Sequence, residues 1–357
     1  MGCRRFPLFS FCLATSLIDR LPPMIVTFTP NPSLDITFTA DHAIQRGQVA
    51  RMATSQTIAG GKGVNVSRVT HAMGHSTLAI VPCDPQDPFV RLLALSETPF
   101  EIIPTDVPVR VNTTLSEPGG VTTKLNGPGA LLDDSAQRAA ASMLLRRLGG
   151  ADWLVMAGSL PPGAPNDWYA QLAWQAKQRN PQLHVAVDTS GSALSVLLNP
   201  TMAAPVDVFC PNTEELIAAI DAPVTAESIE DAALLGDFRP AVQLAQPVIR
   251  RLTNAHHRPV MLLTLGAAGA LLVSATQIHI ATAPSISVVS TVGAGDCALA
   301  GYVCAAANHA PAPERLTQAV LWGSAAATLP GTAVPTPAQL TGLHTTTTHF
   351  SPTTTKV

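Results

Sequence analysis

Residues 290–296 have the sequence Ser-Thr-Val-Gly-Ala-Gly-Asp, and they join an extended segment, Ile286 to Val289, to an Ala-rich segment of helical composition. Glycines allow a backbone to approach an anion closely, and the free N–H groups and dipole of a helix N-terminus attract negative charge. Asp296 falls in the first turn of that helix, beside these amides. The stretch therefore predicts a strand, a glycine turn and a helix that bind an anion next to a carboxylate.

Three interpretations of this stretch differ in the role of Asp296. In the purely structural one, an acidic residue only favours the helix N-terminus. In a dinucleotide fingerprint, Gly293, Gly295 and Ala298 would satisfy GxGxxA, but that motif belongs in the first βαβ unit, and Asp296 would repel a pyrophosphate. In phosphoryl transfer, Asp296 deprotonates the accepting hydroxyl while Gly293, Ala294 and Gly295 stabilise the γ-phosphate. We favour phosphoryl transfer because it uses every feature of the stretch.

The rest of the chain alternates short β-branched segments with Ala/Leu-rich ones. Strands separated by helices form parallel βαβ units, so the predicted fold class is α/β with a doubly wound sheet. The predicted strands are 24–29, 77–82, 153–157, 184–188, 206–209 and 260–265, and the predicted helices include 63–73, 134–147, 166–178, 213–220, 240–255, 296–308 and 314–328.

One region departs from this alternation. Residues 109–115 and 121–126 alternate polar and apolar side chains around Ser-Glu-Pro-Gly-Gly, which predicts a β-hairpin. Period-two geometry puts Arg110, Asn112 and Thr114 on one face of it. With lid strands from about 36–53 and 107–126, we expect a small second sheet that forms a lid beside the core.

The bulk composition argues against several classes of protein. The chain has 357 residues, of which 46% are hydrophobic and 13% charged, with a net charge of -3. Without a cluster of Lys and Arg a nucleic-acid partner is not expected, and no apolar run is long enough to span a membrane. The six cysteines lack metal-ligand spacing, which indicates reduced thiols. We therefore expect a cytoplasmic protein.

Both ends are expected to lie outside the folded domain. Residues 1–23 contain Arg4, Arg5 and an apolar stretch, as a signal peptide does, but the stretch is short and no small-residue cleavage site follows. Because a buried-strand pattern begins at Met24, we interpret 1–23 as a non-native leader or a mis-assigned start, and 24–340 as one domain. The Thr- and Pro-rich tail, 341–357, is predicted to be disordered.

A second polar constellation lies near the N-terminus. Residues 29–35 (TPNPSLD) end the first predicted strand, and residues 59–65 (AGGKGVN) open a helix. The latter is not a Walker loop, which needs GxxxxGK[ST]. It could be a flexible glycine turn with a solvated Lys62, and Asp35 could be a simple turn residue. Taken together, a carboxylate, an amide and exposed peptide N–H groups suit recognition of a polyol.

These motifs occur in the order found in the ribokinase-like sugar kinases, the PfkB family. The chain resembles that family through TPNPSLD, GGKGVNVS, VRVNTT…TTKLNGPG, GSLPPG, PNTEE, LGAAGA and STVGAGD, over about Met24 to Leu340. Within the family it is most similar to 1-phosphofructokinases and tagatose-6-phosphate kinases. The resemblance implies a three-layer α/β/α sandwich, a small β-sheet lid that often forms a dimer clasp, and ATP with Mg²⁺ as phosphate donor.

The resemblance also implies roles for individual residues. Asp296 matches the catalytic base, and Gly293, Ala294 and Gly295 match its anion hole. The other matches are Asp35, Gly60, Gly61 and Asn65 for the sugar, Lys62, Arg110, Lys124 and Ser159 for its phosphate, Asn212, Thr264, Gly266, Gly269, Ser290, Thr291 and Gly295 for the nucleotide, and Glu215 and Asp188 for a metal ion, held through water.

Simpler roles exist for several of these residues. Lys124 could be a solvated hairpin charge. Asn212 and Glu215 have the spacing of a capping box, which is compatible with a nucleotide role. Asp188 could cap the helix that follows it, and residues 264–269 could be an ordinary strand-turn-strand.

Three departures from the family pattern bear on function. Cys210 stands where a lysine is common, and Cys297 follows the catalytic position, where Ser or Ala is commoner. The glycine-rich segment expected after the second strand is instead residues 81–89, Val-Pro-Cys-Asp-Pro-Gln-Asp-Pro-Phe. The resemblance to 1-phosphofructokinases nevertheless predicts phosphorylation of fructose 1-phosphate to fructose 1,6-bisphosphate. Tagatose 6-phosphate or fructose 6-phosphate is the alternative acceptor, and a non-catalytic sugar-phosphate sensor is the alternative class.

Overall fold

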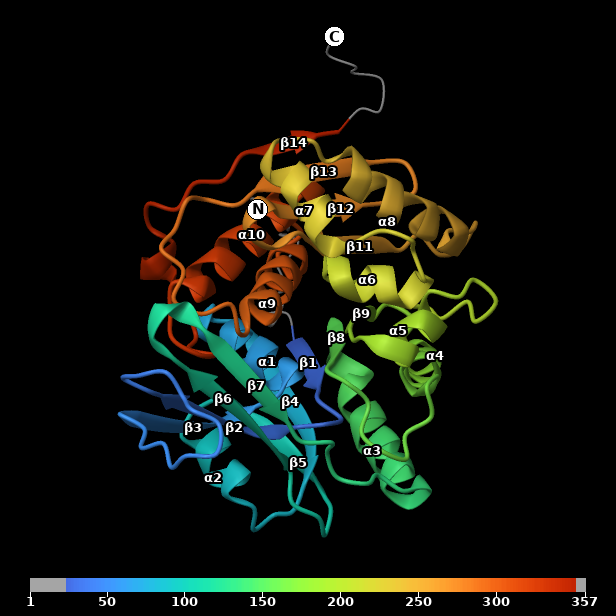
Figure 1. The fold of residues 1–357 in the computed structure, drawn as a ribbon. Helices are drawn as coiled ribbons and strands as arrows, with labels where there is room; N and C mark the ends of the chain where they lie inside the picture. Colours follow the sequence, from blue (N-terminus) through green and yellow to red (C-terminus); the bar gives the residue numbers. More distant parts are fainter. Residues whose placement is uncertain (1–23, 351–357) are drawn as a thin grey trace, which may run out of the picture.

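The computed structural model describes residues 24–350 and contains a large and a small β-sheet (Figure 1). Seven neighbouring strands of the large sheet are parallel, and three antiparallel strands extend one edge. In spatial order the large sheet contains β14 (Thr347–His349), β13 (Ile278–Thr282), β12 (Gly269–Val273), β11 (Val260–Thr264), β10 (Val208–Phe209), β9 (His184–Asp188), β8 (Trp153–Ala157), β1 (Met24–Phe28), β4 (Ser76–Cys83) and β5 (Phe100–Pro104).

Helices cover both faces of this sheet, as Figure 1 shows. One face packs against α1 (Lys62–Ala72), α9 (Ala294–Ala307) and α10 (Ala312–Ala327). The other packs against α3 (Asp134–Arg147), α4 (Trp168–Arg179), α5 (Gly191–Leu197), α6 (Thr213–Ile220), α7 (Ala226–Leu234) and α8 (Arg239–Leu252). This is the expected three-layer α/β/α sandwich.

Strand β1 shows why the sheet needs helices on both faces. Its sequence, MIVTF, is almost continuously apolar, and successive side chains point to opposite faces. Ile25 packs into the cluster with α1, α9 and α10, whereas Val26 and Phe28 pack into the cluster on the opposite face. All three side chains are fully buried.

The small sheet is the predicted lid, with different strand boundaries. Its strands are β3 (Thr54–Gly60), β2 (Ser33–Thr39), β6 (Arg110–Ser116) and β7 (Thr122–Asn126), in that order. The hairpin of β6 and β7 is confirmed. Residues 36–53, however, are mostly the loop between β2 and β3, so this pair of lid strands is not where the sequence placed it. Asp41 to Gly47 form part of this loop and provide no alternating apolar face.

Two segments contain regular structure that the sequence did not predict. The proline-rich segment leads into α2 (Pro88–Ala94), whose N-cap is Asp87. Pro88 occupies the first turn of the helix, where proline is tolerated because its missing N–H would have no partner. In the tail predicted to be disordered, β14 pairs with β13, and Phe350 packs against the core. The prediction for 1–23 lies outside the described residues.

Between residues 24 and 350, no helix is both long enough and apolar enough to cross a membrane. The four cysteines in this range, Cys83, Cys210, Cys297 and Cys304, are free and buried.

Candidate active site

The strand order of the large sheet fixes where a ligand crevice forms. From β1 the chain goes to β4 on one side, and later to β8 on the other side of β1. In doubly wound sheets, ligands bind outside the carboxyl ends of the strands at such a switch point. The segments leaving β1 and β8 are those that contain Asn31, Asp35 and Ser159, and Asn31 Nδ2 lies 3.3 Å from Ser159 Oγ.

The glycine turn opens α9 as the sequence predicted. Gly293 is the N-cap residue with a φ of 79°, in the left-handed region that favours glycine. Apart from its chain neighbours and its own helix backbone, a Cβ atom on Gly295 would meet no atom within 4 Å, so there is open space beside this residue. The loop therefore has the free volume that an anion beside a helix N-terminus requires.

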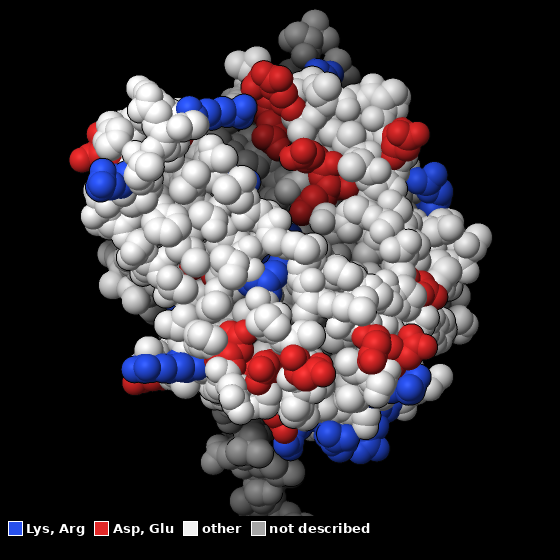
Figure 2. Space-filling view, turned by 60° about the horizontal axis from the view of Figure 1, so that its bottom comes forward, with Lys and Arg blue, Asp and Glu red and all other residues white. Residues whose placement is uncertain are grey.

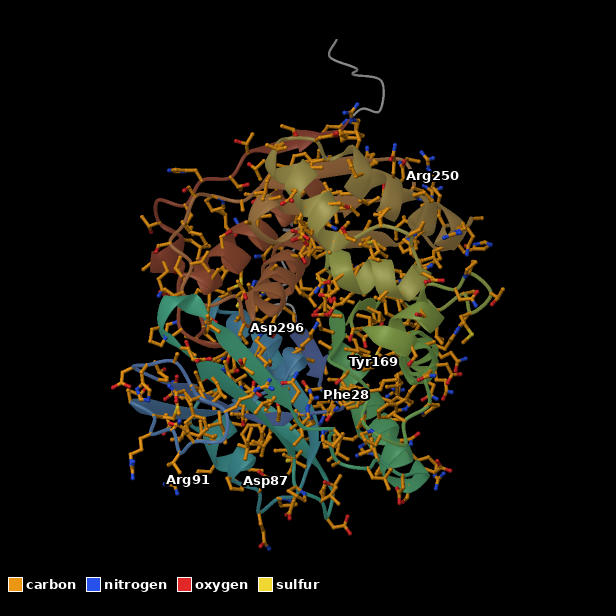
Figure 3. The ribbon with its side chains drawn as sticks, in the orientation of Figure 1. Phe28, Asp87, Arg91, Tyr169, Arg250 and Asp296 are labelled. Carbon is orange, nitrogen blue, oxygen red and sulfur yellow. The ribbon has the colours of Figure 1, made fainter. Side chains whose placement is uncertain are left out.

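Asp296 lies directly behind this turn and is 5% exposed. Figure 3 shows it where the N-terminus of α9 meets α1 and the lid. Its Oδ2 accepts a hydrogen bond of 2.7 Å from Asn65 Nδ2. Burial raises the pKa of Asp296 to about 7, although the charge of Lys62 and the Asn65 hydrogen bond oppose the rise. A carboxylate with a pKa near neutrality is suited to general-base catalysis.

Helix α1 supplies a row of polar side chains to the same region. Lys62, Asn65 and Arg68 are three residues apart, so they lie along one side of the helix. Lys62 meets Asp188 and Glu215, Asn65 meets Asp296, and Arg68 donates to the carbonyl of Thr332 at 3.4 Å. Helix α1 thus links the strand ends, the buried carboxylate of Asp296 and the loop behind the glycine turn.

Lys62 differs from the role that the sequence suggested. Its Nζ lies 2.7 Å from Asp188 Oδ1 and 3.4 Å from Glu215 Oε1. Burial alone would lower the pKa of Lys62, but Asp188, Glu215 and Asp296 together raise it. In this structure Lys62 is therefore paired with the proposed metal-side carboxylates rather than free to bind a substrate phosphate.

The predicted sugar-binding positions lie together at the junction of lid and core. Asp35 Oδ1 accepts hydrogen bonds from Ser33 Oγ at 2.7 Å and Asn112 Nδ2 at 3.0 Å. Burial raises the pKa of Asp35, against these hydrogen bonds and the charges of Arg110 and Arg68. A Cβ on Gly60 would overlap the Asp35 carboxylate, which explains the glycine there. The fixed carboxylate suits recognition of sugar hydroxyls.

The three remaining phosphate candidates occupy different positions. Arg110 is half-buried in the lid, and its Nε is a buried donor with no partner within the described chain. Ser159 lies at the end of β8 beside Asn31. Lys124 lies on β7, every residue of which is exposed, and it pairs with Thr114 in the hairpin. The structure therefore favours Arg110 over Lys124.

The predicted nucleotide side is formed by α6 and the turn after β11. Asn212 and Glu215 make the capping box, with bonds of 3.0 Å from Asn212 N to Glu215 Oε2 and 2.8 Å from Glu215 N to Asn212 Oδ1. The carbonyl of Thr264 accepts from Thr213 Oγ1. Gly266 is exposed, but Gly269 is buried, and a Cβ there would overlap the carbonyl of Ala281. Close strand packing is therefore enough to explain Gly269.

Ser290 and Thr291 directly precede the glycine turn. Ser290 Oγ accepts a hydrogen bond of 3.2 Å from the amide of Val292, and Thr291 is exposed. Figure 2 shows a hollow in the face of the molecule that it presents, with acidic side chains along one wall. Those charges disfavour binding of a free anion unless cations accompany it.

The carboxylates of Asp188 and Glu215 could bind Mg²⁺ only together with water and substrate phosphates. Within residues 24–350, no group of three or more His, Cys, Asp and Glu side chains could hold a metal ion. Mg²⁺ commonly keeps several waters and uses one or two carboxylates together with substrate phosphates. Glu215 and Asp188 fit that mode, with Lys62 as their partner when no ligand is bound.

Sequence reasoning missed Arg68 and the bonding role of Asn112. Arg68 lies near Asp35 and Cys297, and burial lowers its pKa. Its position three residues after Asn65 was the available signal. Asn65 Oδ1 and Asn112 Oδ1 are buried without a hydrogen-bond partner among the described residues. Buried polar atoms without partners are costly, so a ligand that hydrogen-bonds to them would be favoured.

The doubly wound sheet, the glycine turn and the buried carboxylate at the switch point define a phosphotransferase with an alcohol acceptor. A family model described as "pfkB family carbohydrate kinase" matches residues 31–339. The chain belongs to the pfkB family of carbohydrate kinases.

Relatives and solved structures agree with this assignment. The chain is 32% identical to a 1-phosphofructokinase of Haloferax volcanii, over 87% of this chain and 93% of that one. It is 29% identical to ATP-dependent 6-phosphofructokinase isozyme 2 of Escherichia coli, over 86% and 94%. The structure of E. coli phosphofructokinase-2 with fructose-6-phosphate superimposes with a TM-score of 0.75 at 26% identity, over 90% and 97%. A Thermotoga maritima ribokinase, 17% identical over 90% and 98%, shares the fold with a TM-score of 0.66.

Proposed function

We propose that the protein transfers the γ-phosphoryl group of ATP to the free primary hydroxyl of fructose 1-phosphate, producing fructose 1,6-bisphosphate. The observation that carries this proposal is the position of Asp296, held by Asn65 beside the open space at Gly295. A base and an anion site next to each other are what an in-line transfer requires. The relative from H. volcanii supports the choice of acceptor.

Each group in the site has a defined task in this reaction. Asp35 accepts hydrogen bonds from sugar hydroxyls, and Arg110 binds the phosphate that the sugar already carries. Asp296 takes the proton of the accepting hydroxyl, whose oxygen then bonds to the γ-phosphorus while the bond from that phosphorus to the β–γ bridging oxygen breaks. The amides of Gly293, Ala294 and Gly295 stabilise charge on the transferring group.

Glu215 and Asp188 would hold Mg²⁺ through water, next to the triphosphate. When bound, the ion would neutralise charge on the phosphate oxygens. Lys62, now paired with both carboxylates, would then be available to contact a phosphate group. The turn at Thr264 and Gly266 would line the nucleotide pocket.

A coupled assay of ADP release tests this proposal. Fructose 1-phosphate, fructose 6-phosphate and tagatose 6-phosphate are each supplied with Mg-ATP, and the specificity constants are compared. We expect the largest kcat/KM with fructose 1-phosphate. A larger value with fructose 6-phosphate would move the assignment toward the activity named for the E. coli relative. Binding of sugar phosphate with no turnover for any acceptor would indicate a sensor.

The lid is also the surface through which we propose a homodimer. Val111, Val121 and Leu125 are 44%, 57% and 57% exposed around the β6–β7 hairpin. Exposed apolar side chains that cluster on a sheet mark an interaction surface. Sedimentation should give a dimer for the natural chain and a monomer for Leu125→Asp, while a monomeric natural chain would exclude this arrangement.

We also propose a cytoplasmic location. The four cysteines among the described residues are free and buried, which accords with a reducing compartment.

A further inference from the structure

The proline-rich segment that departs from the family pattern contains a buried carboxylate with an unusual pair of partners. Asp87 is 8% exposed. Its Oδ1 accepts a hydrogen bond of 2.8 Å from the amide of Phe89, and its Oδ2 accepts one of 3.0 Å from the amide of Val109. The first bond caps α2, and the second reaches the residue that precedes lid strand β6. Figure 3 shows Asp87 at the α2 end of the molecule, away from Asp296.

No cation accounts for this carboxylate. Arg91, one turn along α2, is exposed, and none of the ion pairs among residues 24–350 involves Asp87. Burial of a carboxylate is costly unless its oxygens are satisfied, and here two backbone amides from different segments satisfy them. Asp87 therefore holds the start of β6 against α2.

The surroundings of this link are stiff. Pro30, Pro32, Pro82 and Pro108 line a cavity of about 10 Å³ beside Val109, which is about the smallest space that can hold one water. Proline fixes φ, so the two chain segments that leave the core for the lid have little conformational freedom there. The Asp87–Val109 hydrogen bond fixes one of these segments where it enters β6.

We infer that Asp87 is a positioning residue that sets Arg110, and through it the affinity for the phosphate already on the substrate. Arg110 directly follows Val109, and its side chain has a buried Nε without a partner. The inference rests on the proposed function in one respect, the assignment of the substrate phosphate to Arg110.

The Asp87→Asn substitution keeps the hydrogen bond from the amide of Phe89 and removes the one from the amide of Val109. An asparagine side chain remains a good N-cap for α2 through its oxygen, but its nitrogen is a donor and cannot accept from Val109. We expect the KM for fructose 1-phosphate to rise by about tenfold, within the range that small misplacements of a binding group produce. The KM for ATP should change little, whereas the melting temperature should fall, because the buried amide of Val109 loses its acceptor.

Asp84→Asn is the matched control. Asp84 lies three residues earlier, and its Oδ1 accepts only from the amide of Gln86 in the same turn. An asparagine can make that same bond, so this variant should behave as the natural protein. Free fructose as acceptor is a second control, because a sugar without phosphate makes no contact that depends on the placement of Arg110.

A double-mutant cycle with Arg110→Met decides the matter. If Asp87 acts through Arg110, Asp87→Asn should have no further effect on fructose 1-phosphate binding once Arg110 is replaced. Additive effects, or equal losses with fructose and fructose 1-phosphate, would overturn the inference. If the protein shows no turnover, the same cycle can be measured as the affinity for fructose 1-phosphate by calorimetry without ATP. A failure of the proposed function can then be told apart from a failure of this inference. Absence of sugar-phosphate binding by the natural protein would refute both.

Discussion

The pKa of a single residue, Asp296, sets the pH dependence of the reaction. Burial raises this pKa to about 7, and the base must be ionised to accept a proton. The kcat/KM should therefore fall about tenfold per pH unit below a midpoint near 7. Asn65→Leu removes the hydrogen bond that opposes the rise, so the midpoint should move to higher pH. A pH–rate profile with its acidic midpoint near 4 would contradict this account of the site.

The same residue links stability to pH. The pKa of Asp296 is higher in the folded protein than in the unfolded chain, so the protonated carboxyl stabilises the fold. This stabilisation is fully present below about pH 4 and is lost as the pH rises through about 7. Asp296→Asn removes the charge that burial disfavours. The variant should gain melting temperature over the natural protein at pH 8, and the gain should shrink at pH 5. Equal differences at both values would mean that Asp296 does not titrate in this range.

Among the elements, the glycine turn before α9 offers a test that separates function from folding. A Cβ at Gly295 meets no protein atom within 4 Å, so Gly295→Ala should leave the melting temperature unchanged or slightly higher. The added methyl group would occupy the space proposed for the transferring phosphoryl group. We expect a loss of kcat of at least about tenfold, since loss of one oxyanion donor already costs this much or more. Full activity in a stable Gly295→Ala variant would place the anion elsewhere.

Elements with strong local signals were predicted well from the sequence. The bounds of α3, α6, β8 and β9 match the structure. Two of the elements that were missed depend on tertiary contacts. Helix α2 begins at a proline and is fixed by a hydrogen bond between distant segments, and β14 is a short edge strand that pairs with β13. The hydrophobic periodicity and the residue composition of a segment carry little information about elements such as α2 and β14.

At the scale of the whole molecule, the order of motifs predicted the family, which the family model confirms. Asp296, Asn65, Asp35 and Arg110 all lie at the switch point or the adjoining lid. The interactions of Lys62 could not be predicted, because its partners are more than 100 residues away: the separations are 126 to Asp188 and 153 to Glu215.

The ion pairs of Lys62 tie α1 to two elements on the far side of the switch point. Lys62→Met would leave two carboxylates without their cation, one of them in the core. We expect a loss of about 1–3 kcal/mol in the free energy of unfolding, less than for a fully buried pair because Lys62 is 37% exposed. Denaturant unfolding measures this, and unchanged stability would show that solvent already screens the pair.

The central claim is that the carboxylate of Asp296 accepts the proton of the sugar hydroxyl during transfer. Steady-state turnover of Asp296→Asn with Mg-ATP and fructose 1-phosphate tests it most directly, with folding checked by its melting curve. The account predicts that kcat falls by about 10²- to 10⁴-fold, the usual contribution of a general base, while the protein remains folded. A folded variant that turns over as fast as the natural protein would contradict the account.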